Sequence, residues 1–376
     1  MLGDVDIARF QAAGLYDPDG PGAADRLALL EYLVGLGGTI EDMLLFERGG
    51  RLPGMAGNLR RRLDRTPMAP RAVAEAGPFE LETMAAVWRA AGFPAFDPDE
   101  PMLHPEDVET FRAYVAGAEL FGEDALLQFV RVMGAALANI ADAAMASFGL
   151  DLEATLEESG ASELDYARTT AHATGVLLDS VPRAMTALFV HHVEAAVQRF
   201  TMSRTETSAE VAQIAVGFLD LEGSTTLMQS LPAREAGIAI SDFESRACAL
   251  VSARGGRVVK TLGDEVMFVM TDEAVACKIA LDLRDYVGEH DVLPALRGAL
   301  ATGELVRGYG DYYGPVVTLA ARAAKRAAPG TVLVTAAVRD LADTSVNGAG
   351  LHFTSAGDHT LRGFDDAFEL FTVERT

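Results

Sequence analysis

The sequence predicts two domains of different fold class, an all-α domain over residues 1–200 and an α+β domain over residues 213–376. Three observations support this prediction. Apolar residues in the first half recur at helical spacing, and a polar, hydroxyl-rich segment at residues 201–212 has the composition of a linker. The second half then alternates strands with helices and includes a tight hairpin, which is typical of a partly antiparallel sheet.

The first half predicts a series of helices. Residues 27–34 carry apolar side chains at helical spacing, and Thr39-Ile-Glu-Asp has the pattern of a capping box that begins another helix. Pro105 opens a helix with acidic residues in its first turn. A long helix rich in Ala, Met and Leu is expected over residues 123–147.

The last helix of this half is expected to begin after Ser162, a good N-cap residue, and to run to about Arg199. Pro182 lies inside it and is expected to kink or break it, because proline removes a backbone hydrogen bond.

The most apolar stretches of the chain do not predict a membrane segment. They lie around residues 132–150 and 169–193, and Asp142, Asp179 and Arg183 interrupt them. Charged side chains in a bilayer span are costly, so we expect no transmembrane helix.

The second half predicts the elements of one sheet-containing domain. Strands are expected at residues 213–219, 295–301, near 305, at 331–335, and near 351–356 and 368–373. Helices are expected at residues 233–253, 273–287 and 314–327, and a hairpin at residues 257–269.

Composition narrows the classes of function. The chain has 55 Asp and Glu against 31 Lys and Arg, a net charge of −24. Nucleic acids and anionic membranes bind to clustered cations, so we expect neither as a partner. Cys248 and Cys277 lie in apolar helical surroundings, which favours small core residues in a reducing cytoplasm over a disulfide. The N-terminus has no signal-peptide pattern, so a cytoplasmic location is expected.

Two aspartates end apolar strands in the second half. Asp220 follows the first strand and precedes a Gly-Ser-Thr turn, and Asp264 lies in the turn of the hairpin. Two carboxylates at strand ends are what a divalent-metal site requires. Acids at strand ends are also common solvated turn residues, so the pair carries the prediction, and Glu222 and Glu265 remain alternative ligands.

A lysine and a third aspartate are further candidates. Lys260 lies four residues before Asp264 in the hairpin. It either keeps an edge strand soluble or donates to a base or a phosphate. Asp311 lies in a Gly-Asp-Tyr-Tyr-Gly-Pro segment, where a plain turn residue is the alternative to a ligand-binding one.

Three arginines are candidates for binding phosphate. Arg322 follows Thr318 by four residues on a predicted helix, so the two side chains share a face. Arg297 and Arg362 each precede a glycine and interrupt an apolar segment. A planar guanidinium suits the charge of a phosphate, although a solvated surface arginine is the alternative for each.

Taken together, residues 213–374 resemble the catalytic domain of class III nucleotidyl cyclases. The likeness rests on four separate segments: Phe218-Leu-Asp-Leu-Glu-Gly-Ser-Thr, Lys260-Thr-Leu-Gly-Asp, Gly310 to Arg322, and Leu361-Arg-Gly. The family fold implied by this resemblance is a βαββαβ core that works as a head-to-tail homodimer.

The resemblance implies a two-metal site. Asp220, Asp264 and the backbone carbonyl of Leu221 would hold two divalent cations, Mg²⁺ or Mn²⁺. The turn from Gly223 to Thr225 would offer backbone N–H groups to phosphates.

The resemblance also implies the residues that bind the nucleotide. Arg322 would stabilise the charge of the transition state, Arg297 and Arg362 would hold the pyrophosphate end, and Thr318 stands where the family usually has a ribose-positioning Asn. The metal aspartates and the other residues of one site would come from different chains of the homodimer.

Lys260 and Asp311 together match adenine, which presents an acceptor at N1 and a donor at N6. The resemblance therefore implies an adenylyl cyclase that converts ATP into 3′,5′-cyclic AMP and pyrophosphate. Two alternatives stay open: a weak or inactive sensor or scaffold that keeps the cyclase fold, which Thr318 supports, and a guanylyl cyclase. A second departure from the family is Ser224, where many members have Phe.

The first half resembles the helical regulatory domain of the pH-responsive actinobacterial adenylyl cyclases, mainly in Ser162-Glu-Leu-Asp-Tyr-Ala and the helix after it. That family implies a domain that restrains or releases the catalytic dimer and that can bury a lipid or fatty acid. His191 and His192 are candidate proton sensors in this helix, with partly exposed helix residues as the alternative. Protons, a fatty acid or a protein partner remain open as the signal, and so does its sign.

Overall fold

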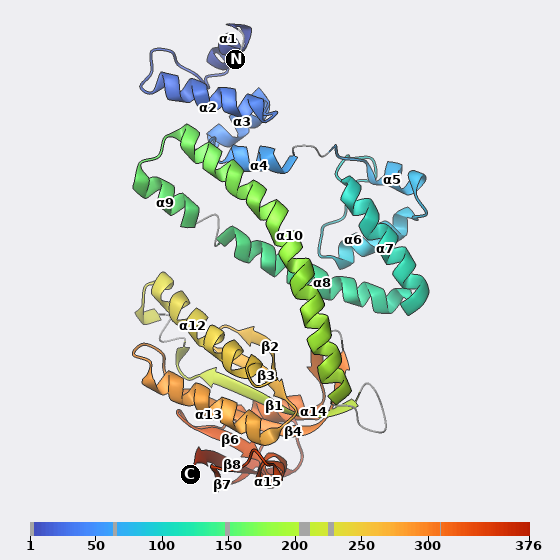
Figure 1. Ribbon diagram of the computed structural model, residues 1–376, viewed down its shortest axis with the longest axis vertical. Helices are drawn as coiled ribbons and strands as arrows, with labels where there is room; N and C mark the ends of the chain where they lie inside the picture. The colour runs from blue at the N-terminus through green and yellow to red at the C-terminus, as the bar shows by residue number, and fades with distance from the viewer. Residues whose placement is uncertain (1–3, 63–65, 147–150, 203–210, 225–228, 309) are drawn as a thin grey trace. The chain divides into compact units, whose positions relative to one another are not determined.

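Two units make up the chain, Met1–Val193 and Glu194–Thr376, and each is described by itself. Figure 1 shows the computed structural model. The structure describes residues 4–62, 66–146, 151–202, 211–224, 229–308 and 310–376.

The first unit is helical, as predicted. Its helices are α1 (Asp4–Ala12), α2 (Ala23–Gly35), α3 (Ile40–Arg48), α4 (Met55–Arg62), α5 (Pro70–Ala76), α6 (Leu81–Ala90), α7 (Pro105–Phe121), α8 (Glu123–Ala144), α9 (Asp151–Ser159) and α10 (Glu163–Met202), whose end passes into the second unit.

Two predicted helix starts are confirmed. Thr39 caps α3 in a reciprocal capping box, in which its Oγ1 accepts from the Asp42 N–H at 3.1 Å and the Asp42 carboxylate accepts from the Thr39 N–H. The Ser162 hydroxyl oxygen accepts from the Asp165 N–H at 3.2 Å at the start of α10. Of the kink or break predicted at Pro182, the break does not occur, since α10 continues through the proline as one helix.

The helical unit has two apolar cores. The first joins α1–α4 to the beginning of α10 and is built from buried side chains such as Phe10, Leu29, Leu33, Met43, Met55 and Ala167. Arg26 adds polar links, because its guanidinium bonds Glu47 on α3 at 2.5 Å and Glu163 on α10 at 3.0 Å. The second core joins α5–α8 and includes Val73, Phe79, Met84, Phe111 and Val130.

Helices α8 and α10 keep exposed apolar side chains. Leu188, Phe189 and Val197 on α10 are 58%, 58% and 59% exposed, and Leu137 and Ile140 on α8 are also exposed. By length and composition, α8 and much of α10 could cross a membrane, although core helices of soluble proteins pass the same test. The absence of a membrane segment therefore stays a prediction.

The second unit is an α+β domain. It contains β1 (Val211–Leu221), α12 (Ala233–Ser252), β2 (Arg257–Leu262), β3 (Glu265–Met270), α13 (Glu273–Glu289), β4 (Leu296–Gly308), β5 (Asp311–Tyr313), α14 (Pro315–Ala324), β6 (Val332–Thr335), α15 (Ala336–Thr344), β7 (Leu351–Thr360) and β8 (Ala367–Arg375). The predicted linker falls mainly on residues 203–210, which lie outside the described residues, and β1 begins at Val211.

One sheet organises this unit, with the strand order β2-β3-β1-β4-β6-β8-β7 and with β5 paired to β4. Only β4 and β6 pair in parallel among the described strands. Helices α12, α13 and α15 bury Phe243, Ile279 and Val338 against one face (Figure 1). Helix α14 buries Val316 and Ala320 against the other face. The sheet is covered by helices on both faces. Its strands and turns carry most of the predicted site residues, and α14 carries Thr318 and Arg322.

Three details differ from the prediction. The two strands expected at residues 295–301 and near 305 are one strand, β4. Asp311, expected in a turn, begins the short strand β5. Helix α15 was not predicted, since its amphipathic pattern is short and directly follows β6.

Candidate active site

The ends of β1 and of the β2–β3 hairpin bring Asp220 and Asp264 into neighbouring positions. The backbone N–H of Leu221, next to Asp220, donates to the Asp264 carbonyl at 3.0 Å. Asp264 lies in a two-residue turn, because Leu262 pairs directly with Glu265. Gly263 has a φ of +70° in this turn, a conformation that glycine adopts without steric cost.

Four carboxylates gather at this corner of the sheet, and we call Asp220, Glu222, Asp264 and Glu265 the acidic cluster. Asp220 is the direct cross-strand partner of Glu265 on β3. Directly opposed residues of an antiparallel pair share one face, so like charges repel there.

Two of these carboxylates have raised pKa values. Burial raises the pKa of Asp220 above its usual value, bonds from Arg297 oppose the shift, and the charges of Asp264 and Glu222 add to it. The pKa of Glu265 is also raised, first by burial and then by the charge of Asp220. Burial and mutual repulsion in the acidic cluster thus favour the protonated forms of Asp220 and Glu265.

Arg297 brings positive charge to this corner through direct contacts, and the charge of Lys325 also acts on Glu265. Arg297 is the cross-strand partner of Asp220 on β4. Its Nε and Nη2 donate to Asp220 Oδ2 at 3.1 and 3.0 Å, and its Nη1 contacts Glu222. Sequence reasoning assigned Arg297 to phosphate alone and missed these contacts, because they depend on the register between β1 and β4.

The residues present fit a divalent cation, although in the part of the chain that the structure describes no three His, Cys, Asp or Glu side chains form a ready metal-binding group. Carboxylates and a backbone carbonyl are the hard oxygen donors that Mg²⁺ and Mn²⁺ accept. Burial is the main cause of the raised pKa of Asp220, and a cation at the acidic cluster would offset the repulsion from Asp264 and Glu222 that adds to it.

Ser224 was not among the predicted site residues, but it contacts Asp264. Gly223, with a φ of +82°, turns the chain after β1. Ser224 is then buried at 8% exposure, and its hydroxyl donates to Oδ2 of Asp264. Thr225, predicted as a phosphate-binding residue, lies outside the described residues.

Lys260 and Asp311 meet, although they are far apart in the chain. Lys260 Nζ donates to Asp311 Oδ2 at 2.7 Å and so joins β2 to β5. Partial burial alone would raise the pKa of Asp311, but the bonds from Lys260 and from the Tyr312 N–H hold that pKa below its usual value. Asp311 is therefore an ionised acceptor beside a cation.

Three other predicted residues stand apart from these contacts. Helix α14 buries one face, which leaves Thr318 exposed and Arg322 partly buried on the other. Arg362 is exposed in the turn between β7 and β8. Within the described residues, no side-chain hydrogen bond holds any of the three, and none links the Lys260–Asp311 pair to the acidic cluster.

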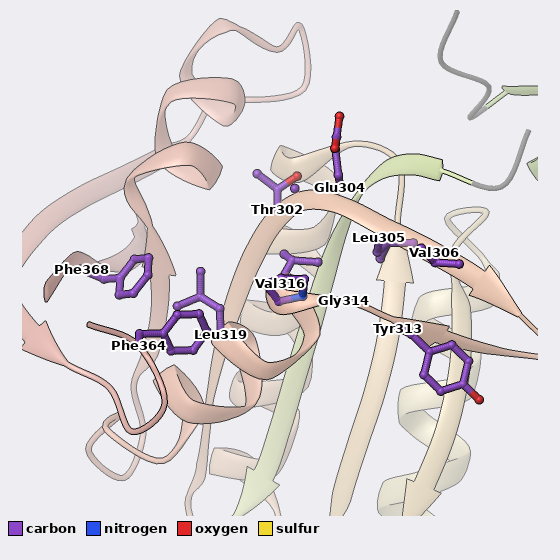
Figure 2. Close-up of a pocket in the computed structure, with 12 residues that line it drawn as sticks. Thr302, Glu304, Leu305, Val306, Tyr313, Gly314, Val316, Leu319, Phe364 and Phe368 are labelled. Carbon is purple, nitrogen blue, oxygen red and sulfur yellow. The ribbon is translucent and has the colours of Figure 1, made fainter. Parts of the chain in front are cut away.

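A pocket of about 490 Å³ lies beside β4, β5 and the start of α14, and Figure 2 shows its lining. It is mostly apolar, with Leu319, Phe364 and Phe368 in its wall, and the two phenylalanine rings meet edge to face. None of the predicted site residues lines it.

Both halves of the chain match known family models. Residues 9–197 match the adenylate cyclase regulatory domain, and residues 206–375 match the adenylate and guanylate cyclase catalytic domain.

Relatives match nearly the whole chain. An uncharacterised protein of Mycobacterium tuberculosis is 32% identical over 98% of this chain and 95% of its own length. A protein of the same species named pH-sensitive adenylate cyclase is 29% identical over 96% of this chain and 91% of its own length. The crystal structure of an adenylyl cyclase from P. aeruginosa aligns with a TM-score of 0.40 and 18% identity, over 44% of this chain and 96% of that one.

These matches cover the helical unit and the sheet-containing unit alike. The chain therefore belongs to the class III nucleotidyl cyclases, and it joins an adenylate cyclase regulatory domain to an adenylate and guanylate cyclase catalytic domain.

Proposed function

We propose that the protein is an adenylyl cyclase that converts ATP into 3′,5′-cyclic AMP and pyrophosphate. The observation that carries the proposal is the Lys260–Asp311 pair, bonded at 2.7 Å. Relatives named adenylate cyclase, from Glutamicibacter nicotianae and Streptomyces coelicolor, are 29% and 30% identical and add support.

The pair suits adenine for a simple reason. Lys260 has three N–H donors, so it can keep Asp311 and still donate to the N1 acceptor of adenine. Asp311 is an acceptor only and can take a hydrogen bond from the N6 amino group. Guanine has a donor at N1 and an acceptor at O6. The Lys260 donor would then face a donor, and the Asp311 acceptor would face an acceptor. An unpaired polar group in a binding site costs about 1–3 kcal/mol.

The acidic cluster is proposed as the metal site. Asp220, Asp264 and the Leu221 carbonyl would hold two Mg²⁺ or Mn²⁺ ions. When bound, such ions lower the pKa of a coordinated hydroxyl and neutralise phosphate charge. Within this site the ribose 3′-hydroxyl would lose its proton to solvent as its oxygen bonds to the α-phosphorus. The bond from the α-phosphorus to the oxygen that bridges to the β-phosphate would break, and pyrophosphate would leave.

Three arginine side chains are proposed to bind the triphosphate of ATP. Arg297 lies beside Asp220 and would bind the pyrophosphate end together with Arg362. Arg322 would stabilise charge on the transferring phosphoryl group, an effect worth about 3–4 kcal/mol when a donor is well placed. Thr318, one turn earlier on α14, would position the ribose, and the Gly223 turn would offer backbone N–H groups to a phosphate.

A homodimer is proposed because the described contacts of one chain leave the acidic cluster and the Lys260–Asp311 pair unconnected. Two copies would then form two sites, each with metal ligands from one chain and base-reading residues from the other. The helical unit is proposed to regulate this dimer in the cytoplasm, with protons, a fatty acid or a protein partner as the signal.

The test uses purified full-length protein with ATP or GTP and either Mn²⁺ or Mg²⁺. We expect cyclic AMP to form much faster than cyclic GMP, and we expect the double variant Lys260→Glu, Asp311→Cys to lose the preference for ATP. Equal rates on both nucleotides in the unaltered protein, or an unchanged preference in the variant, would contradict the assignment of the pair.

A second candidate function is a cyclase-fold sensor with little turnover. It is favoured by Thr318, whose hydroxyl is shorter than the Asn amide usual in the family. Absence of any cyclic nucleotide product at saturating ATP and Mn²⁺, with nucleotide binding intact, would favour this candidate.

A further inference from the structure

Ser224 is the departure from the family pattern that the proposed mechanism leaves unused. It lies in the turn after β1, and its hydroxyl is hydrogen-bonded to the carboxylate of Asp264, 40 residues further along the chain. The side chain is only 8% exposed, so water has little access to compete for the bond. A buried hydroxyl bonded to a carboxylate is a charge-assisted contact.

Two hydrogen bonds join the end of β1 and the turn after it to Asp264 of the hairpin, one at its backbone and one at its side chain. The Leu221 N–H holds the backbone carbonyl of Asp264 at 3.0 Å, which fixes the position of the hairpin turn. The Ser224 hydroxyl holds the carboxylate itself. Among the described side chains, Ser224 is the donor that bonds to the Asp264 carboxylate.

The two metal-binding aspartates are thus held by different kinds of donor. Asp220 is bonded by the guanidinium of Arg297, a cation that would compete with a metal for the same oxygen. Asp264 is bonded by a neutral hydroxyl, which orients the carboxylate and leaves its charge free for a metal. Outer donors of this kind typically change metal affinity by about 10–100-fold.

We propose that Ser224 is a positioning residue that orients the Asp264 carboxylate toward a divalent cation. The inference rests on the proposed function, because it assumes the metal site at the acidic cluster. A Phe at this position, as in many family members, offers no donor, so the positioning device is a feature of this chain and of others with Ser.

The test measures metal binding directly. Full-length protein is titrated with Mn²⁺ in the presence of 3′-deoxy-ATP, which cannot cyclise, and free Mn²⁺ is followed by electron paramagnetic resonance. Ser224→Ala is expected to bind Mn²⁺ at least about tenfold more weakly. Ser224→Thr keeps the hydroxyl and is expected to bind within about threefold of the unaltered protein. In cyclisation assays Ser224→Ala should raise the Mn²⁺ activation constant far more than the KM for ATP.

A matched control separates positioning from stability. Thr302 is also 8% exposed, and its hydroxyl donates to the Glu273 carboxylate at 2.7 Å, away from the acidic cluster. Thr302→Val removes a similar bond and is expected to lower the melting temperature without changing Mn²⁺ affinity.

Two results would overturn the inference alone: Mn²⁺ affinity of Ser224→Ala equal to that of the unaltered protein, or an equal loss of affinity in Ser224→Ala and Thr302→Val. Tight Mn²⁺ binding without any cyclic AMP formation by the unaltered protein would instead overturn the proposed function. No Mn²⁺ binding by the unaltered protein would overturn both.

Discussion

We expect replacement of Arg297, which contacts the acidic cluster directly, to lower the free energy of unfolding of the sheet-containing unit. Arg297 donates twice to Asp220, at 3.0 and 3.1 Å, and contacts Glu222. The side chains of Arg297 and Asp220 are only 24% and 18% exposed. Replacing Arg297 by Gln would leave four crowded carboxylates without their guanidinium.

The expected loss follows from this geometry. Breaking a fully buried ion pair by removing one partner costs about 3–5 kcal/mol. Residual exposure and proton uptake reduce this, so we expect Arg297→Gln to lower the free energy of unfolding by roughly 2 kcal/mol at pH 7 without metal. Arg297→Lys keeps the charge but not the two parallel bonds, so its loss should be smaller.

The loss should depend on pH in a defined direction. The pKa values of Asp220 and Glu265 are raised in the folded protein, so the folded state binds more protons than the unfolded state in the range above their ordinary values. Without Arg297 both pKa values rise further. The difference from the unaltered protein should therefore shrink as pH falls from 7 toward 5, because protonation removes the repulsion, and Mn²⁺ should also reduce it.

The assay is a urea titration read by hydrogen–deuterium exchange of peptides from β1 and β4, which reports on the sheet-containing unit itself. Arg112→Gln is the control, since it removes an exposed pair with Glu109 at 2.7 Å on α7 of the helical unit. Read in exchange of peptides from α7, it should cost less than about 1 kcal/mol. An Arg297→Gln protein as stable as the control at pH 7, or a difference that grows at lower pH, would refute this reasoning.

Three other predictions concern catalysis and regulation. A mixture of Asp220→Ala and Arg322→Ala chains, each inactive alone, should recover activity through heterodimers with one intact site, and no recovery after proven subunit exchange would contradict shared sites. Thr318→Asn should raise kcat for cyclic AMP formation several-fold if the ribose contact limits turnover; an unchanged kcat would show that it does not. Full-length protein and residues 211–376 alone, assayed with ATP and Mn²⁺ over about pH 5.5–8, should give different pH profiles if the helical unit senses protons, and identical profiles would remove that hypothesis.

Local patterns were enough to predict much of this protein. Helical spacing and capping signals such as Thr39 depend on residues a few positions apart, so the helical half could be predicted from sequence. The hairpin around Gly263 followed from two apolar runs and a turn residue with positive φ. Asp220 and Asp264 were candidates because one lies at the end of an apolar strand and the other in the hairpin turn.

Other features depend on pairing between distant segments. Lys260 meets Asp311 only because β5 folds back on β4, and a three-residue strand has too little pattern to predict. Helix α15 was not predicted because it is also short, with 9 residues directly after β6. At Pro182 the helix does not break, since α10 continues on both sides of the proline.

The motifs and periodicities along the chain determine the fold class, the family and the candidate carboxylates, since turn chemistry and side-chain spacing act over a few residues. The partners of those carboxylates were decided by the folded sheet. Arg297 faces Asp220 across 77 positions of sequence, and Ser224 reaches Asp264 across 40. Strand register selects such partners, and a slip of one residue would turn each side chain to the other face of the sheet.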